Sequence, residues 1–427
     1  MRSVTLASRI LAAVLASFSV SAWPSSAAHI PIDHVIVLMQ ENRSFDTYFG
    51  RLHFEGQPLA VPEPRGASNP NPLDPDARPI TVFHKQHYCE VADLDHSWNG
   101  THREIDGGRM DGFTAANENP ADPTGRRAMG FYDETDLPFY YALYRTFAIG
   151  DHYFASAPTQ TFPNRFHLLA GTSFGHVRND APGPGEFSQR SIFNELDEAG
   201  ISWKVYADEF PLAFAFLFSY VREGPAAAKV VHFADFQLDA AAGTLPQVAF
   251  IDPILVGPNN VENDEHPPSN VQVGEQFAAD VVNTLFKSPN WSSSALFLTY
   301  DEHGGFFDHM PPPAAVPPDN IPPLLQPGDV PGAFDMYGVR VPVAVVSPFA
   351  RPHFVSHLVN DHTSILRFIE NRFGLPSLTR RDAAANPMLE FFDFSAPSFA
   401  TPPALPPAPL NSAEVAFCAS QPSNTFP

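Results

Sequence analysis

Residues 34–46 read HVIVLMQENRSFD, in which an apolar run at 34–39 gives way at once to polar and charged residues. A short, partly β-branched run of this kind is typical of a buried strand in a parallel sheet. Comparable runs, each bounded by Gly, Pro or Asp, recur at 201–206, 248–251, 295–300 and 339–346. We therefore expect all of these segments to be central strands of one sheet.

Helical patterns alternate with these strands along the chain. They lie at 137–147, 191–199, 274–286 and 363–373, and Gly200 follows the second of them as a stop signal. Such an alternation predicts an α/β fold in which helices cover a sheet.

Several segments outside these elements are rich in Pro, of which the chain holds 46. The segments 56–80, 179–188 and 310–334 also contain Gly, and we expect them to be ordered surface excursions around the sheet. The proline spacing at 396–410 instead predicts an extended, polyproline-like segment.

The N-terminus has the pattern of a signal peptide. Arg2 and Arg9 precede an apolar run at about 10–23, and small residues follow it, so cleavage after Ala22 and cleavage after Ala28 both remain open. The run is shorter than the roughly 20 residues that a membrane-spanning helix needs. We therefore expect a secreted or periplasmic protein. The expected organisation is a signal peptide at 1–28, one catalytic domain at 29–390 and a Pro-rich, irregular tail at 391–427.

Charge and cysteine content narrow the class of protein. The formal net charge is −22, from 25 Lys and Arg against 47 Asp and Glu. A field of that sign disfavours nucleic acid and anionic membrane surfaces as partners. An anionic substrate must therefore be attracted locally, by a metal ion, a His cluster or a helix N-terminus.

Cys89 and Cys418 are compatible with one disulfide in an exported protein, but the sequence leaves their pairing open.

Polar side chains follow two of the predicted strands at the point where each strand ends. Glu41 and Asn42 come after the first strand, and Asp301 and Glu302 come after the strand at 295–300. Ligands of open α/β sheets bind beyond the carboxyl ends of the strands. Oxygen ligands suit hard or borderline divalent cations, and adjacent carboxylates repel unless a cation or proton compensates them. The sequence predicts a shared metal ion here, although helix capping or a turn would explain each pair singly.

A threonine precedes a predicted helix in the string PTQTFPNRFHLLAGT. Pro163 suits the first helical turn because its fixed φ matches the helix and its missing N–H has no partner there anyway. Free amide donors and the helix dipole would then favour a bound phosphate and a partly ionised hydroxyl at Thr161. The alternative is that Thr161 or Thr159 is only an N-cap.

Histidines stand near these motifs in a chain that holds 17 of them. A subset beside a bound phosphate is expected to neutralise it or to protonate the leaving oxygen, while the others are ordinary surface or core residues. The candidates are His96, His102, His266, His303, His309 and His362.

Together these strings resemble the bacterial and plant phospholipase C and acid phosphatase A phosphoesterase family, which is related in fold to alkaline phosphatases and arylsulfatases. The matching strings are ENRSFDTYFG, DLDHSW with GRMDGF, TFPNR, NDEHPP with VGEQF, and TYDEHGGFFDHMPPP. They appear in the family's order and span about residues 33–373. The resemblance implies a three-layer α/β/α sandwich, alkaline phosphatase-like, with a mostly parallel central sheet.

The resemblance also implies roles for the candidate residues. Thr161 would be the nucleophile that forms a covalent phosphothreonine, because Thr159 is offset from the PNR landmark. His96 and His266 match catalytic positions that contact phosphate, as does Asn42. The implied metal ligands are Glu41, Asn42, Asp301 and Glu302. The ion is open among Ca, Zn, Mn and Mg.

The expected function is exported, metal-dependent hydrolysis of phosphoesters of the phospholipase C type, acting on phosphatidylcholine or a related headgroup. A broad-specificity acid phosphatase on the same site is the main alternative, because the chain after about residue 375 is too short for the extra β domains of the large bacterial phospholipases C. A sulfatase is disfavoured because no Cys or Ser stands in a CxPxR context. A binding protein without catalysis would be expected to lack the nucleophile or a metal ligand. The expected partner is a small-molecule or lipid phosphoester, with transient contact to a membrane surface if it is a lipid.

Overall fold

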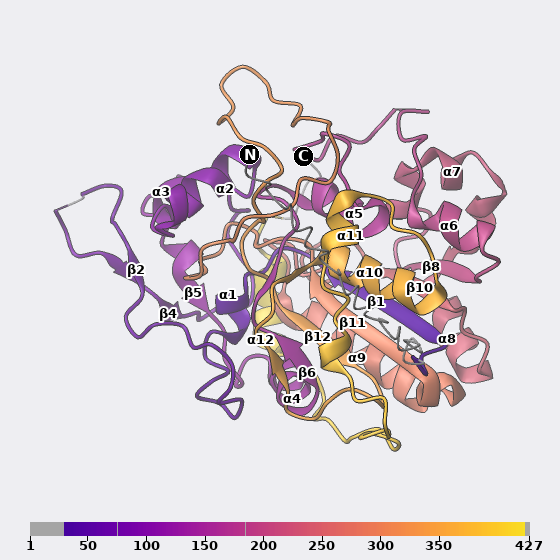
Figure 1. The fold of residues 1–427 in the computed structure, drawn as a ribbon. Helices are drawn as coiled ribbons and strands as arrows, with labels where there is room; N and C mark the ends of the chain where they lie inside the picture. The colour runs from indigo at the N-terminus through magenta and orange to yellow at the C-terminus, as the bar shows by residue number, and fades with distance from the viewer. Residues whose placement is uncertain (1–29, 75, 184, 423–427) are drawn as a thin grey trace, which may run out of the picture. The chain divides into compact units, whose positions relative to one another are not determined.

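A computed structural model describes residues 30–422 apart from 75 and 184, so the predicted signal peptide lies outside the described residues. The elements below belong to the unit Ile32–Pro427. At its centre is an eight-stranded sheet (Figure 1). Its strands, in order across the sheet, are β13 (Val355–Ser356), β6 (Ala148–Gly150), β12 (Val343–Val346), β11 (Ser294–Tyr300), β1 (His34–Gln40), β10 (Val248–Asp252), β8 (Trp203–Ala207) and β9 (Val230–His232).

The sheet is mostly parallel, as predicted. Only β12 runs against both of its neighbours, β11 and β6. The predicted strand at 339–346 is shorter in the structure because its first residues leave the sheet: Val341 donates its N–H to the carbonyl of Tyr153, and Arg340 bridges Phe154. The edge strands β9 and β13 and the strand β6 beside β13 are absent from the sequence prediction, since two or three residues give no readable periodicity.

One face of the sheet is covered by α5 (Thr161–Ala170), α6 (Ile192–Glu198) and α10 (His362–Phe373). Phe250 of β10 and Phe297 of β11 both pair with Val37 of β1, so they point to the same face. The Phe250 ring meets Phe193 of α6, and the Phe297 ring meets Phe368 of α10, with centroids 5.6 Å and 5.0 Å apart.

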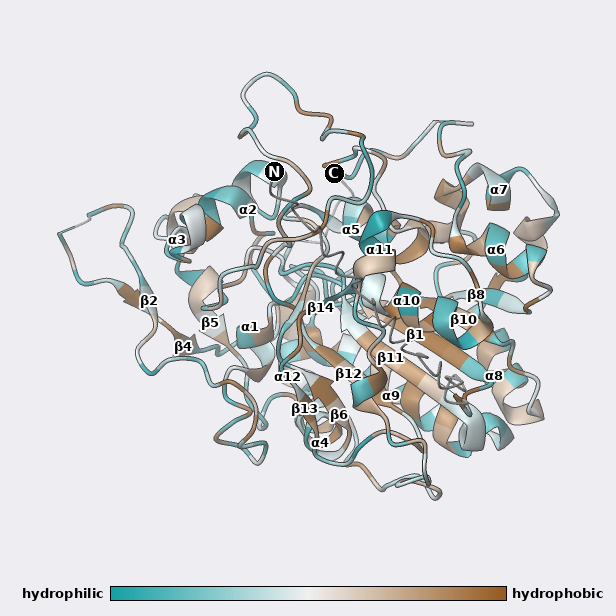
Figure 2. Cartoon of the chain, viewed as in Figure 1, coloured by the Kyte–Doolittle hydropathy of each residue, from teal (hydrophilic) through white to brown (hydrophobic). Residues whose placement is uncertain are grey.

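The opposite face is covered by α8 (Phe233–Ala242) and α9 (Val271–Lys287). Tyr206 pairs with Ile251, one residue out of phase with Phe250, and its ring meets Phe236 of α8. The α8 helix packs in turn on α9 through Phe233 and Phe277. Helices therefore cover both faces, and the predicted three-layer α/β/α arrangement is confirmed; Figure 2 shows apolar strands between helices with hydrophilic outer sides.

The predicted helices form close to their expected bounds. The pattern at 137–147 is α4 (Pro138–Thr146), and that at 274–286 is α9, which starts earlier because Asn270 caps it by accepting from the N–H of Gln272. The remaining helices are α1 (Phe45–Phe49), α2 (Trp98–Ile105), α3 (Phe113–Ala116), α7 (Ser219–Arg222), α11 (Arg380–Ala384) and α12 (Ser412–Ala419). Short 3₁₀ helices lie at Asp106–Gly108, Arg126–Met129, Phe214–Leu217, Pro225–Lys229, Pro289–Ser293 and Leu389–Phe391. Two-residue strands pair as β14 (Asn360–Asp361) with β7 (Tyr153–Phe154), β2 (Ser68–Asn69) with β3 (Ile80–Thr81), and β4 (Phe83–His84) with β5 (Gly130–Phe131).

None of the helices in the described residues is long and apolar enough to cross a membrane.

The tail at 391–427, expected to be irregular, contains the helix α12. Asn411 caps this helix, and the helix packs on the early chain: Phe417 stacks on the ring of His87, with centroids 4.0 Å apart. Cys418 is fully buried and forms a disulfide with Cys89, 329 residues away. The pairing that the sequence left open is therefore made.

Removing this disulfide by Cys89→Ala with Cys418→Ala should lower the free energy of unfolding by about 2–4 kcal/mol, because the unfolded chain regains the entropy of a long loop. Urea titration followed by tryptophan fluorescence measures the change. A midpoint equal to that of the unmodified protein would contradict a stabilising role for the tail.

Candidate active site

The two polar pairs predicted from strand ends lie side by side. β1 and β11 are parallel neighbours in which Gln40 pairs with Tyr300, so Asn42 and Asp301 leave the sheet at the same edge. The backbone N–H of Asn42 donates to Oδ1 of Asp301 at 3.0 Å. The structure thus brings together the segments that hold the four predicted metal ligands.

A close backbone approach holds these two segments in place. Asn42 has a φ of 64°, in the left-handed region that Asn tolerates better than most residues. A Cβ on Gly304 would lie only 2.5 Å from the carbonyl oxygen of Asn42, and Gly304 itself has a positive φ. The glycine in the string DEHGG is therefore needed for the loop after β11 to fold over Asn42.

Thr161 lies at this edge as the first residue of α5. The helix begins two residues earlier than the position of Pro163 suggested, with Gln160 as its N-cap, and Pro163 is tolerated because it falls within the first turn. The Thr161 hydroxyl donates to Oδ1 of Asn42 at 3.4 Å and is nearly buried. Thr159 instead donates to the carbonyl of Val177 at 2.6 Å, so only Thr161 faces the strand ends.

Buried negative charge dominates the site. Burial raises the pKa of Glu41 well above its usual value, and Asp301 and Glu302 add to that rise. Burial also raises the pKa of Asp301 to about 6, again with help from Glu302. One cation opposes them: Nη2 of Arg165 is 3.0 Å from Oε1 of Glu41, and its Nε is 3.9 Å from Oδ2 of Asp301.

A chain of alternating acids and histidines extends from Glu302 toward solvent. Nδ1 of His96 is 2.5 Å from Oε1 of Glu302, and its Nε2 is 3.3 Å from Oδ2 of Asp93. The ring of His266 lies 5.5 Å from that of His96, with its Nε2 3.9 Å from the same Asp93 oxygen. Although burial opposes it, the neighbouring Glu302 and Asp93 raise the pKa of His96 well above its usual value. Both predicted phosphate-contacting histidines therefore line one mouth of the site.

The other candidate histidines make structural hydrogen bonds. His362 lies under the site with Nε2 2.6 Å from the carbonyl of Asp301, and burial lowers its pKa to about 3, so the neutral ring donates this bond. His303 pairs with Glu104 at 2.7 Å, and His309 contacts Asp46 at 2.6 Å. His102 bonds the Trp98 carbonyl.

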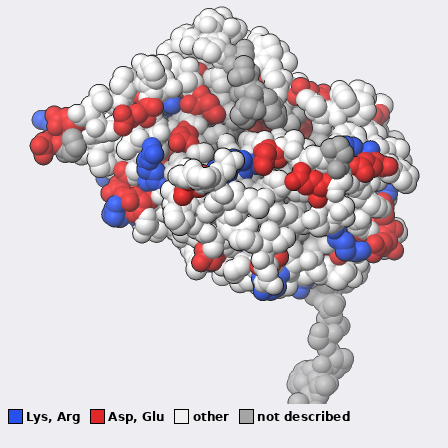
Figure 3. Space-filling view, turned by 90° about the horizontal axis from the view of Figure 1, so that it is seen from above, with Lys and Arg blue, Asp and Glu red and all other residues white. Residues whose placement is uncertain are grey.

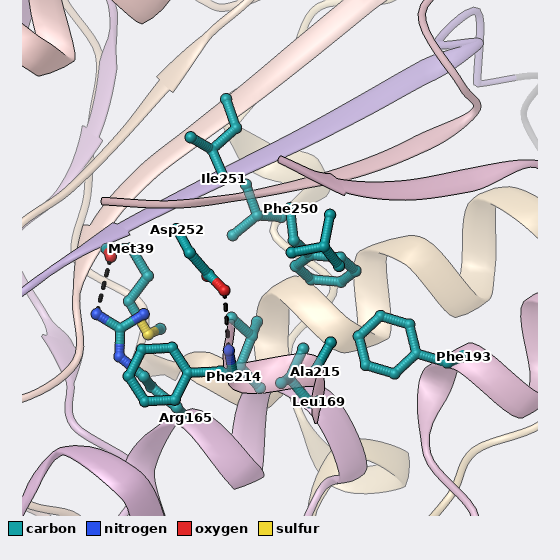
Figure 4. A pocket seen from close by; sticks show the side chains of 12 residues that line it. Met39, Arg165, Leu169, Phe193, Phe214, Ala215, Phe250, Ile251 and Asp252 are labelled. Carbon is teal, nitrogen blue, oxygen red and sulfur yellow. Dashed lines mark hydrogen bonds between the residues drawn. The ribbon is translucent and has the colours of Figure 1, made fainter. Parts of the chain in front are cut away.

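Sequence reasoning missed two residues of the site, Asp93 and Arg165. Both stand inside strings quoted for the resemblance, DLDHSW and TFPNR, but a lone Asp or Arg carries no spacing signal of its own. Contacts behind the site fix the position of the Arg165 side chain (Figure 4). Its guanidinium donates to the carbonyl of Met39 at 3.0 Å and stacks on Phe214. The pocket drawn there is lined mainly by apolar side chains, so it positions Arg165 and offers little to a phosphoester.

The predicted donors are of the chemical kind that divalent cations bind, although the ligand atoms of Glu41, Asp301 and Glu302 do not form one of the groups of described residues that lie within 4.8 Å of one another. Among the described residues, the buried Oδ2 of Asp301 and the buried Nε of Arg165 have no hydrogen-bond partner, and these two atoms lie 3.9 Å apart. Carboxylate oxygens of Glu41, Asp301 and Glu302 together with the amide oxygen of Asn42 are ligands that hard cations prefer. At the mouth, ligand atoms of Asp93, His96 and His266 lie within 4.8 Å of one another, so these described residues form a second group able to hold a metal ion.

Comparisons with known proteins give relatives for nearly the whole unit. The model of the phosphoesterase family matches residues 32–376. The chain is 34% identical to "Non-specific phospholipase C1" of Arabidopsis thaliana over 85% of this chain and 71% of that protein. It is 32% identical to "Phospholipase C B" of Mycobacterium tuberculosis (89% and 81% covered) and 31% identical to "Non-hemolytic phospholipase C" of Burkholderia pseudomallei (87% and 60% covered).

Solved structures give weaker matches. A phosphonate monoester hydrolase from Silicibacter pomeroyi aligns with 61% of this chain and 72% of its own, at 12% identity and a TM-score of 0.36. Human ectonucleotide pyrophosphatase/phosphodiesterase 5 aligns with 56% and 90%, at 13% identity and a TM-score of 0.35. The family match over most of the chain and the identities above 30% show that the protein belongs to the phosphoesterase family and is a hydrolase of phosphoric ester bonds.

Proposed function

We propose that this protein is an exported, metal-dependent phosphoesterase of the phospholipase C type that works through a covalent phosphothreonine at Thr161. The observation that carries the proposal is the position of the Thr161 hydroxyl. It lies at the N-terminus of a buried ten-residue helix and donates to Asn42, beside the carboxylate of Asp301. The names of the relatives, phospholipases C from plants and bacteria, support the choice of substrate class.

Different residues bind the phosphate and carry out the two chemical steps. The first amide groups of α5 and the imidazoles of His96 and His266 hold the phosphoryl group and neutralise part of its charge. The Thr161 hydroxyl gives up its proton to solvent as its oxygen attacks phosphorus in line, the ester bond to the alcohol breaks, and a histidine at the mouth gives the departing oxygen a proton. Water then hydrolyses the phosphothreonine and frees Thr161 for another cycle.

Glu41, Asn42, Asp301 and Glu302 would hold a divalent ion, which when bound lowers the pKa of a hydroxyl beside it and offsets charge on the phosphoryl oxygens. Arg165 opposes the rise in the pKa of Glu41 and of Asp301 and helps to position both carboxylates, since its guanidinium lies near both. Export is supported by the signal-peptide pattern at 1–28 and by the disulfide, a bond typical of oxidising compartments.

Thr161→Ala should abolish turnover, a loss of at least about a thousandfold in kcat, because it removes the proposed nucleophile. Thr161→Ser should retain most activity, since it keeps the hydroxyl. The matched control is Thr159→Ala, which removes a hydroxyl two residues away that bonds the Val177 carbonyl and should leave kcat close to normal. Near-normal activity of Thr161→Ala, measured with nitrophenyl phosphorylcholine, would rule out this nucleophile.

Exhaustive chelation should remove activity, and one ion among Ca, Zn, Mn and Mg should restore it. Asp301→Asn should lower the bound metal, measured by plasma mass spectrometry, because it removes a ligand charge. Asp252→Asn is the control: Asp252 is another buried carboxylate at the end of a neighbouring strand, but it accepts from Phe214 and is not a proposed ligand. Metal-free protein with full activity would contradict metal dependence.

Side-by-side assays separate the two substrate classes. A phospholipase C should hydrolyse phosphatidylcholine and nitrophenyl phosphorylcholine with a higher kcat/KM than nitrophenyl phosphate. The reverse order would assign the same site to a broad-specificity phosphomonoesterase. No hydrolysis of any of them would count against both.

A further inference from the structure

Residues 311–333 form a long Pro-rich loop that directly follows the string DEHGGFFDHM. The loop exposes apolar side chains. Figure 1 shows it as the orange loop that projects at the top of the picture, beyond the helices α2 and α5. Its exposed large apolar residues are Val316 (42% exposed), Ile321 (40%), Leu324 (53%), Leu325 (37%) and Val330 (38%). Several such residues on one surface loop are uncommon unless the loop meets a partner.

The loop is held firmly although its apolar side chains face outward. The indole of Trp98 donates to the carbonyl of Val330 at 2.9 Å, and the N–H of Leu324 donates to the carbonyl of Gly175 at 2.8 Å. Arg178 pairs with Asp329 at 2.5 Å. The leucines are therefore presented by a fixed backbone, and little conformational entropy is lost when they meet a partner.

These anchors place the loop at the rim of the proposed active site. Trp98 opens α2, two residues after His96. Val177, between Gly175 and Arg178, accepts the hydroxyl of Thr159, two residues before Thr161. The loop thus contacts segments directly joined to the proposed phosphate-binding histidine and the proposed nucleophile.

The charge of the loop points to a neutral, apolar partner. Asp319 and Asp329 are the only charged residues in 311–333, and both are engaged, Asp319 by the hydroxyl of Thr172 at 2.5 Å and Asp329 by Arg178. No Lys or Arg is present to attract an anionic surface. The chain carries a net charge of −22, and Figure 3 shows more acidic than basic side chains on the face seen from above.

We propose that residues 316–330 are a docking loop that inserts Ile321, Leu324 and Leu325 into the surface of a zwitterionic phospholipid bilayer and so brings the active site to its lipid. This inference rests on the proposed phospholipase function. The loop itself carries no basic residue, and the two arginines that contact it are engaged, Arg178 by Asp329 and Arg380 by Asp319 and Asn320. Binding to a zwitterionic surface therefore rests on the hydrophobic effect, and the net charge of the chain would repel an anionic surface.

The test compares Leu324→Asp with Leu238→Asp, which changes the same residue type at a more exposed position of α8 (67% against 53% exposed). Flotation with phosphatidylcholine vesicles measures binding. Hydrolysis of vesicle phosphatidylcholine and of dissolved nitrophenyl phosphorylcholine measures the two activities. Leu324→Asp should reduce vesicle binding and vesicle hydrolysis by about tenfold, and Leu324→Asp with Leu325→Asp by more, because a leucine leaves the interface and a charge replaces it.

Hydrolysis of the dissolved substrate should be unchanged in all these variants, and Leu238→Asp should match the unmodified protein in every assay. Equal loss with Leu238→Asp, unchanged vesicle binding with the double variant, or preferential binding to anionic vesicles would overturn the docking loop. A dimer that Leu324→Asp dissociates in sedimentation, without loss of vesicle binding, would assign the loop to a second copy instead. If the unmodified protein hydrolyses neither substrate, the proposed function fails, while flotation still reports on docking.

Discussion

The structure depends on compensating the negative charge that is buried where β1 and β11 end. Glu41, Asp301 and Glu302 all lie within the protein, and burial of carboxylates without a partner is costly. Arg165 contacts two of them, and His96 contacts the third. Oδ2 of Asp301 has Arg165 as an ion-pair neighbour at 3.9 Å but accepts no hydrogen bond from the described residues, and a bound cation would satisfy it more closely.

Arg165 also joins this charge balance to the proposed nucleophile. It belongs to the same helix as Thr161, one turn further along, so its ion pair with Glu41 fixes how α5 enters the site. Loss of Arg165 would therefore move Thr161 as well as leave Glu41 unpaired. The helix that presents the hydroxyl and the ligands that would hold the metal are positioned by one interaction.

Sequence pattern predicted the central strands and the strand-end site because long apolar runs and the polar residues after them are local signals. The short strands β6 and β9 were missed because each has three residues and forms by pairing with its neighbours. The packing of α12 on the early chain could not be predicted because it joins Cys418 to Cys89, 329 residues away, which no local pattern reveals. Asp93 and Arg165 could be found only in three dimensions, since their meaning comes from the groups they contact. The roles of Thr161, the histidines and the metal ligands remain predictions.

The central claim is that Thr161 becomes phosphorylated during turnover. Rapid acid quenching of the enzyme during hydrolysis of nitrophenyl phosphorylcholine, followed by peptide mass spectrometry, tests it directly. The account predicts a phosphorylated or phosphorylcholine-modified peptide with the modification at Thr161, absent from the Thr161→Ala variant. An active enzyme that gives only unmodified Thr161 peptide at every quench time, or a modification at another residue, would contradict it.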